Sequence, residues 1–226
     1  MNSSNSDDRM LRFYGASHPE MFEIERRCMD RSGLVIRHLD SDLPEGLVLD
    51  VGAGNGFTAI RLCSPARKIV ALEPDPGMID SSLRLPWVRG LAQDIPFRSN
   101  AFDAAYATWA FFLAGVPGTD RGLEELQRVV KNEGKLIIVD NAGGDDFSSL
   151  ATRSTASDPD WWRDRGFEET LIHTSFKFDS LQEADRLLTF YFGDEAAARN
   201  RKTEIEYRVV AYSTTVRKPC FDLDAG

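Results

Sequence analysis

The sequence predicts an α/β fold in which helices cover both faces of a mostly parallel β-sheet. Short apolar segments alternate with segments of helical periodicity between residues 47 and 141, which is typical of a parallel sheet with crossover helices. A glycine-rich turn, Gly52 to Gly56, joins the first apolar segment to a helical one, and parallel sheets bind ligands at such turns. The 226 residues are 42% hydrophobic, which is enough for one large core.

The elements before the tail follow from local patterns. Met21, Ile24 and Cys28 recur at helical spacing, which predicts an amphipathic helix over residues 19–31. A second helical piece is expected in the segment LVIRHL that follows Gly33. Strands are expected within 47–53, 68–74, 87–94, 102–110 and 135–141. Helices are expected within 57–63, 77–84 and 122–134, the last ending at Gly134.

The tail adds a strand, a helix and a second strand. A helical turn within 158–167 is followed by an alternating, strand-like segment over 169–178. Ser180 and Glu183 have the S-x-x-E spacing of a capping box, which predicts a helix start. Residues 204–216 alternate over a longer stretch. We therefore expect an N-terminal helical cap or lid over residues 1–46, one domain over 47–218 and a tail over 219–226.

Composition argues against several classes of partner. The formal net charge of −9 disfavours both nucleic acid and an anionic membrane surface. Cys28, Cys63 and Cys220 are too far apart for a CxxC metal site, and their odd number suggests no disulfide framework, so we expect no metal and a reducing, cytoplasmic location. No signal peptide is evident, and the longest apolar run, 104–116, is too short to span a bilayer.

The glycine loop in VLDVGAGNGFT admits three classes of ligand. A Walker A phosphate loop needs a lysine after its last glycine, and Phe57 stands after Gly56 instead. The dinucleotide fingerprint G-x-G-x-x-G would place its third glycine at position 57, which disfavours a nicotinamide-dependent oxidoreductase. The observed spacing is G-x-G-x-G, preceded by Asp50.

This loop resembles the first motif of class I S-adenosylmethionine-dependent methyltransferases, and three later segments strengthen the resemblance. In that family an acid at the position of Glu73 binds the ribose hydroxyls, and one at Asp94 binds the adenine amino group. The amide after it, here of Ile95, meets an adenine ring nitrogen, and the end of the fourth strand lies against the methionine part. The resemblance implies a cofactor site made of Asp50, Gly52, Ala53, Gly54, Gly56, Glu73, Pro74, Met78, Asp94, Ile95, Ala107 and Thr108.

The resemblance covers residues 47–140 and implies a Rossmann-like, doubly wound, seven-stranded sheet with an antiparallel last strand. It implies a class I methyltransferase domain over 47–218. The D-x-P-F run after Gln93 resembles the small-molecule branch, methyltransferase type 11, which includes ubiquinone/menaquinone methyltransferases. The expected reaction is in-line transfer of a methyl group from S-adenosylmethionine to a small-molecule acceptor, leaving S-adenosylhomocysteine.

The sequence does not assign a catalytic group. Because the sulfonium already activates the methyl group, the protein mainly positions the two reactants and sometimes removes a proton. His18, His173 and Tyr14 are the candidates for that role. The absence of a convincing acid–base group keeps an alternative open, a non-catalytic protein of this fold that binds the cofactor as a sensor or partner module. The identity of the acceptor, and a choice between monomer and homodimer, stay open.

Overall fold

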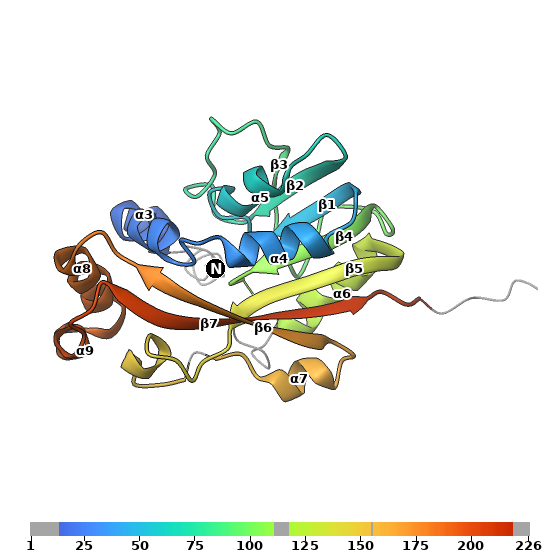
Figure 1. Ribbon diagram of the computed structural model, residues 1–226. Coiled ribbons are helices and arrows are strands. Elements are labelled where there is room, and N and C mark those ends of the chain that lie inside the picture. Colours follow the sequence, from blue (N-terminus) through green and yellow to red (C-terminus); the bar gives the residue numbers. More distant parts are fainter. Residues whose placement is uncertain (1–13, 111–117, 155, 219–226) are drawn as a thin grey trace, which may run out of the picture.

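The computed structural model describes residues 14–110, 118–154 and 156–218 (Figure 1). The expected tail over 219–226 and residues 1–13 of the expected cap lie outside these ranges. The described chain forms one seven-stranded sheet in the order β3-β2-β1-β4-β5-β7-β6. The strands are β1 (Gly46–Val51), β2 (Arg67–Glu73), β3 (Trp87–Arg89), β4 (Phe102–Thr108), β5 (Val130–Asn141), β6 (Glu168–Lys177) and β7 (Glu204–Thr215).

The strand pairing confirms the predicted fold class. Strand β1 pairs in parallel with both β2 and β4, and β4 pairs in parallel with β5. Strand β7 inserts between β5 and β6 and runs antiparallel to both. The chain builds outward from β1 through β2 to β3 and then crosses back to β4. The direction of winding therefore changes between β1 and β4, and ligands of open α/β sheets bind at the carboxyl end of such a position.

Helices cover both faces of the sheet (Figure 1). Alternate residues of each strand face opposite sides, so Val48 enters one core with α3, α4 and α8, while Leu49 enters another with α6 and α7. We call these the first core and the second core. The helices are α2 (Tyr14–Ser17), α3 (Pro19–Cys28), α4 (Leu34–Asp42), α5 (Phe57–Leu62), α6 (Thr119–Val129), η1 (Ser148–Leu150), α7 (Pro159–Arg163), α8 (Leu181–Phe192) and α9 (Asp194–Arg199).

The helix start predicted at Ser180 is confirmed. The Ser180 hydroxyl accepts a hydrogen bond from the Glu183 N–H at 3.1 Å, and the Glu183 carboxylate accepts one from the Asp179 N–H at 3.0 Å. Two side chains thus satisfy backbone donors that the first turn of α8 cannot use internally.

Two predicted elements differ from the structure. Residues 77–84 form turns rather than a helix, because the Asp80 carboxylate accepts from both the N–H and the hydroxyl of Ser82 and so competes with helical bonding. Helix α6 ends at Val129 rather than Gly134, and the intervening residues open β5. Glu133 has a φ of 61°, and the β4–β5 register shifts between Phe102 and Ala104 to accommodate the extra residues.

Arg67 joins three elements at the amino edge of the sheet. Its guanidinium is almost fully buried and donates to the carbonyls of Leu43, Pro44 and Leu62 and to the exposed Asp40 carboxylate, at 2.7 to 3.3 Å. These bonds fasten the ends of α4 and α5 to the first residue of β2. One side chain therefore satisfies carbonyls that would otherwise be buried without donors.

We predict that Arg67→Met lowers the free energy of unfolding by about 3–5 kcal/mol, because several buried carbonyls lose their donor. Urea unfolding measures this change. Lys68→Met is the matched control, because Lys68 is the next residue of β2 and is exposed. If the two variants unfold at the same urea concentration, Arg67 does not hold these helix ends.

Candidate functional site

A cavity of about 920 Å³ opens beside the carboxyl ends of β1, β2 and β4. Its wall includes the glycine loop from Gly52 to Asn55, Glu73 and Pro74 after β2, and Thr108 to Ala110 after β4. The opposite wall comes from α3, α4 and the connection between them. The cavity lies at the point where the winding of the sheet reverses, and its volume suits a small-molecule ligand.

The glycine loop requires glycine for both conformation and space. Gly52, Gly54 and Gly56 have φ values of 72°, 55° and 79°, which residues other than glycine rarely adopt. A Cβ on Gly52 would lie 2.6 Å from the Cβ of Ala110. The loop therefore packs against the residue that follows β4, while its backbone remains open to the cavity.

Glu73, the last residue of β2, ties two loops together. Its Oε2 accepts from the Gly54 N–H at 2.8 Å, and its Oε1 accepts from the Asp75 N–H at 2.9 Å. Burial raises the pKa of the Glu73 carboxyl, and the two backbone bonds oppose that shift. Each carboxylate oxygen can accept a second hydrogen bond, so both oxygens can still bind hydroxyl groups of a ligand.

Asp50 lies in β1, two residues before Gly52 of the glycine loop, and is fully buried. The Tyr106 hydroxyl donates to its Oδ2 at 2.8 Å, and its Oδ1 has no hydrogen-bond partner. Burial raises the pKa of Asp50 to about 7, the Tyr106 hydrogen bond lowers it, and the neighbouring Glu73 raises it further. A buried acceptor oxygen without a donor, next to an open glycine loop, fits a site that receives a ligand bearing hydrogen-bond donors.

Part of the chain is similar to known methyltransferases. The profile of the methyltransferase domain family matches residues 49–138. The demethylmenaquinone methyltransferase of Mycolicibacterium gilvum is 35% identical over 97 residues, which are 42% of this chain and 42% of that protein. A ubiquinone/menaquinone biosynthesis C-methyltransferase of Citrifermentans bemidjiense is 34% identical over 108 residues, 42% of this chain and 45% of that protein. Residues 49–138 of this chain are thus similar to a methyltransferase domain.

A solved methyltransferase agrees with this fold. The S-adenosylmethionine-dependent methyltransferase of Thermotoga maritima superposes with a TM-score of 0.60 at 19% identity, covering 90% of this chain and 98% of that one. The cofactor of this domain class is S-adenosylmethionine. The matched part spans less than half the length of the curated relatives described above.

The adenine contacts expected of the methyltransferase domain differ in part from the structure. The Ile95 N–H donates to the buried Glu125 carboxylate of α6 at 2.9 Å, so it is not free to meet an adenine nitrogen. Arg128, also of α6, holds the same carboxylate and donates to the Ile95 carbonyl. Asp94 is exposed and does not line the cavity. The loop after β3 is thus fastened to α6 through its backbone.

The other expected cofactor residues divide between the cavity and the cores. Ala53, Pro74 and Thr108 line the cavity, together with Gly52, Gly54 and Glu73. Met78 is buried beside the loop, where its Cε would lie 3.7 Å from a Cβ on Gly54. Ala107 is fully buried in the second core, because neighbouring strand residues face opposite sides and Thr108 takes the cavity side. The Ala107 side chain therefore points away from the cavity.

None of the expected catalytic candidates lines the cavity. His18 is exposed at the start of α3, with its Nδ1 3.0 Å from the Ser17 hydroxyl. His173 is exposed on β6, opposite Arg208 of β7. Tyr14 packs beside α8, and its hydroxyl lies 2.8 Å from that of Tyr191. No described histidine is therefore placed to act on a ligand in the cavity.

Sequence reasoning missed the charged groups that α3 and α5 bring to the cavity. Glu25 and Arg26 of α3 line it, and so does Arg61 of α5. The Arg61 guanidinium carbon lies 3.4 Å from the centre of the Phe57 ring, and that of Arg26 lies 4.6 Å from it. The run EIERR already carried these charges, but the packing of α3 against the rest of the fold decides which of them face inward.

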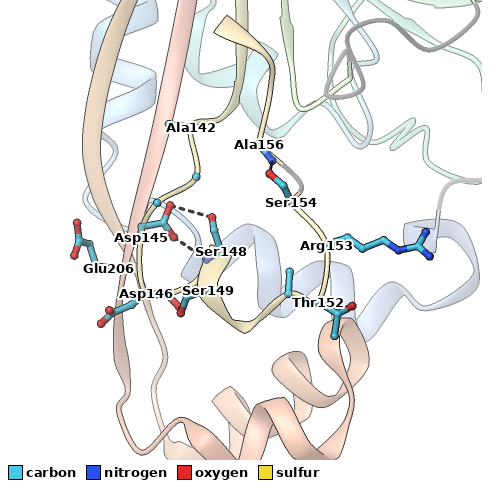
Figure 2. Close-up of a pocket in the computed structure, with 13 residues that line it drawn as sticks. Ala142, Asp145, Asp146, Ser148, Ser149, Thr152, Arg153, Ser154, Ala156 and Glu206 are labelled. Carbon is cyan, nitrogen blue, oxygen red and sulfur yellow. Dashed lines mark hydrogen bonds between the residues drawn. The ribbon is translucent and has the colours of Figure 1, made fainter.

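A second cavity, of about 480 Å³, lies after β5 (Figure 2). The segment after β5 lines this cavity, which shares no residue with the first. Asp145 is buried there and accepts from the N–H and the hydroxyl of Ser148, at 2.7 and 3.0 Å (Figure 2), and from the Arg208 N–H at 3.2 Å. Its carboxylate therefore anchors the loop to β7.

Within the described residues, no group of histidine, cysteine and acidic side chains could hold a metal ion. No helix of the described chain is long and apolar enough to cross a membrane.

We predict that the free energy of unfolding falls as pH rises from 5 to 8. Burial raises the pKa of Asp50 and of Asp140 to about 7, from an ordinary 3.8, so the folded state binds more protons than the unfolded state in that interval. The fall should be at least about 2 kcal/mol. Asp50→Asn should flatten the profile, whereas Asp185→Asn, an exposed control on α8, should not. Urea unfolding at several pH values measures both, and a stability that rises toward pH 8 contradicts the prediction.

Proposed function

We propose that this chain transfers the methyl group of S-adenosylmethionine to a small-molecule acceptor by in-line displacement and releases S-adenosylhomocysteine. The observation that carries the proposal is one cavity bounded by the glycine loop and Glu73 on one side and by α3 and α4 on the other. We further propose that α3 and α4, part of the expected N-terminal cap, cover the bound reactants and exclude water from them.

The charges around the cavity suit the methyl donor. The two Glu73 oxygens can accept from two neighbouring hydroxyls, as a ribose presents them. Asp50 offers an unpartnered oxygen near the loop, and its negative charge would complement an ammonium or sulfonium group. Arg26 and Arg61 present guanidinium groups that would complement a carboxylate. S-adenosylmethionine carries each of these groups, so the residues present fit it.

The wall of the cavity supports an apolar acceptor. Phe22 and Ile36 line it from the N-terminal side, and Trp109 lines it after β4. The Trp109 indole N–H donates to the Tyr207 hydroxyl at 2.9 Å, so its ring is held in place. Because two similar proteins are named for methylation in ubiquinone and menaquinone synthesis, a reduced short-chain demethylmenaquinone is the first acceptor to test.

The fold by itself does not fix the reaction. A [4+2]-cyclase superposes on this chain with a TM-score of 0.54 at 20% identity, covering 84% of this chain and 81% of that one. Cofactor binding must therefore be measured separately from methyl transfer. Binding without any product, from reduced demethylmenaquinone or from a metabolite extract, would favour the sensor or partner-module alternative. Labelled-methyl S-adenosylmethionine and mass spectrometry detect the product.

We predict that Glu73→Gln weakens S-adenosylhomocysteine binding about 10- to 100-fold, on the scale of charge-assisted hydrogen bonds to two hydroxyls. Isothermal titration calorimetry measures the affinity. Asp185→Asn is the control and should bind as the wild type does. Folded wild-type protein that binds neither S-adenosylmethionine nor S-adenosylhomocysteine would remove the proposed function.

A further inference from the structure

Four carboxylates line the cavity, and three of them are held by an arginine or by backbone N–H groups. Glu23 is paired with Arg26, whose Nε donates to it at 3.1 Å. Asp30 accepts from the N–H groups of Leu34 and Val35 and from the Thr174 hydroxyl, at 2.6 to 3.0 Å, which fixes the start of α4. Glu73 holds the two loops described above. The fourth carboxylate is that of Glu25.

Glu25 lies on α3 in a partly buried position. No lysine or arginine pairs with it among the ion pairs of the described residues. The Tyr191 hydroxyl of α8 donates to its carboxylate, and Tyr191 in turn meets the Tyr14 hydroxyl. Burial raises the pKa of Glu25 to about 7, and the Tyr191 bond opposes the shift. The group therefore exchanges a proton near neutral pH.

We propose that Glu25 is the proton acceptor of the methyl transfer. The inference rests on the proposed function, and it names the group that the sequence does not assign. An electron pair of the acceptor, a lone pair on oxygen or nitrogen or a π pair of a quinol ring at carbon, forms the bond to the methyl carbon, and the carbon–sulfur bond breaks with its electron pair passing to sulfur. The proton that the acceptor atom carried moves to a Glu25 oxygen, so charge and atoms balance.

This role sets the class of acceptor. The methylated atom must carry a proton that can leave, as a hydroxyl, an amine or the ring carbon of a quinol does. Phe22, Ile36 and Trp109 also line the cavity, and their side chains favour an acceptor with an aromatic ring. Tyr191 is a positioning residue, because its hydroxyl orients the carboxylate and opposes the rise in the Glu25 pKa that burial causes.

The charged and titratable groups around Glu25 affect the pH at which it ionises. Tyr191 of α8 bonds to it, and Tyr207 of β7 lies close enough that the negative charge of Glu25 helps raise the Tyr207 pKa. Arg27 and Arg31 are paired with Asp179. Arg37 and Arg61 line the same cavity. Glu25 accepts a proton only when ionised, so the rate should rise tenfold per pH unit below about 7 and level off above it.

The ionisation can be measured without an acceptor. The probe is full-length protein labelled with ¹³C at the glutamate carboxyl, titrated by NMR between pH 5 and 9 with S-adenosylhomocysteine present. We expect one carboxyl to titrate near pH 7, to vanish in Glu25→Gln and to move to higher pH in Tyr191→Phe. Glu20→Gln, an exposed control in the first turn of α3, should leave it unchanged. If every glutamate titrates below pH 5.5, the proposal is overturned.

The catalytic role is tested by single-turnover methyl transfer over the same pH range. The acceptor is reduced demethylmenaquinone or the acceptor that the product assay of the proposed function identifies. Glu25→Gln should lower the rate about 10²- to 10⁴-fold and remove its dependence on pH below 7, while its affinity for S-adenosylhomocysteine stays within threefold. Glu25→Asp should restore part of the rate. A Glu25→Gln enzyme that keeps the pH dependence overturns this proposal alone. Wild-type protein that binds no cofactor overturns the proposed function as well.

Discussion

The site depends on the two hydrogen bonds that the Glu73 carboxylate accepts. They join the Gly54 N–H, in the loop after β1, to the Asp75 N–H, in the loop after β2. Parallel pairing brings the ends of these strands to the same edge of the sheet, with Val51 opposite Leu72. The carboxylate then fixes how the loops sit relative to each other. Without it, the glycine backbone and the ligand-facing oxygens of Glu73 would not share one wall.

The alternation of side chains along the strands decides what faces this wall. Asp50 and Glu73 share the cavity side of the sheet with Thr108, because each lies an even number of residues from a member of the first core. Ala107 takes the other side and is buried in the second core. The motif shows which segment of the chain lies near the cavity. Whether a given strand residue faces the cavity or the opposite core depends on the alternation of side chains along the strand.

The sequence predicted the sheet, the glycine loop and Glu73 because each has a signal within a few residues. Contacts between distant segments had no such signal. Glu125 binds the Ile95 N–H across 30 residues, and this bond removes the amide that the motif offers to adenine. Glu25 is one of several charged residues on a predicted amphipathic helix, and its contact with Tyr191 of α8 and the pairing of Glu23 with Arg26 distinguish the two glutamates. Local patterns therefore locate the glycine loop and Glu73, while long-range packing decides which charged groups line the cavity.

The buried acids show how this fold combines stability with chemistry. A carboxyl removed from water keeps its proton to higher pH, which costs stability when the protein works near neutrality. Burial raises the pKa of Asp50 in β1 and of Glu25 at the cavity in this way, and each carboxylate accepts a hydrogen bond from a tyrosine hydroxyl rather than from a cation. Glu125 is the contrast, because Arg128 and the Ile95 N–H lower its pKa to about 2 and fix it as a structural anion. A tyrosine orients a carboxyl without fixing its charge, so Glu25 can both lie still and change protonation state. A fixed position and a changeable charge suit a group that must accept a proton. An arginine partner would keep the carboxylate ionised and so prevent it from taking up the proton.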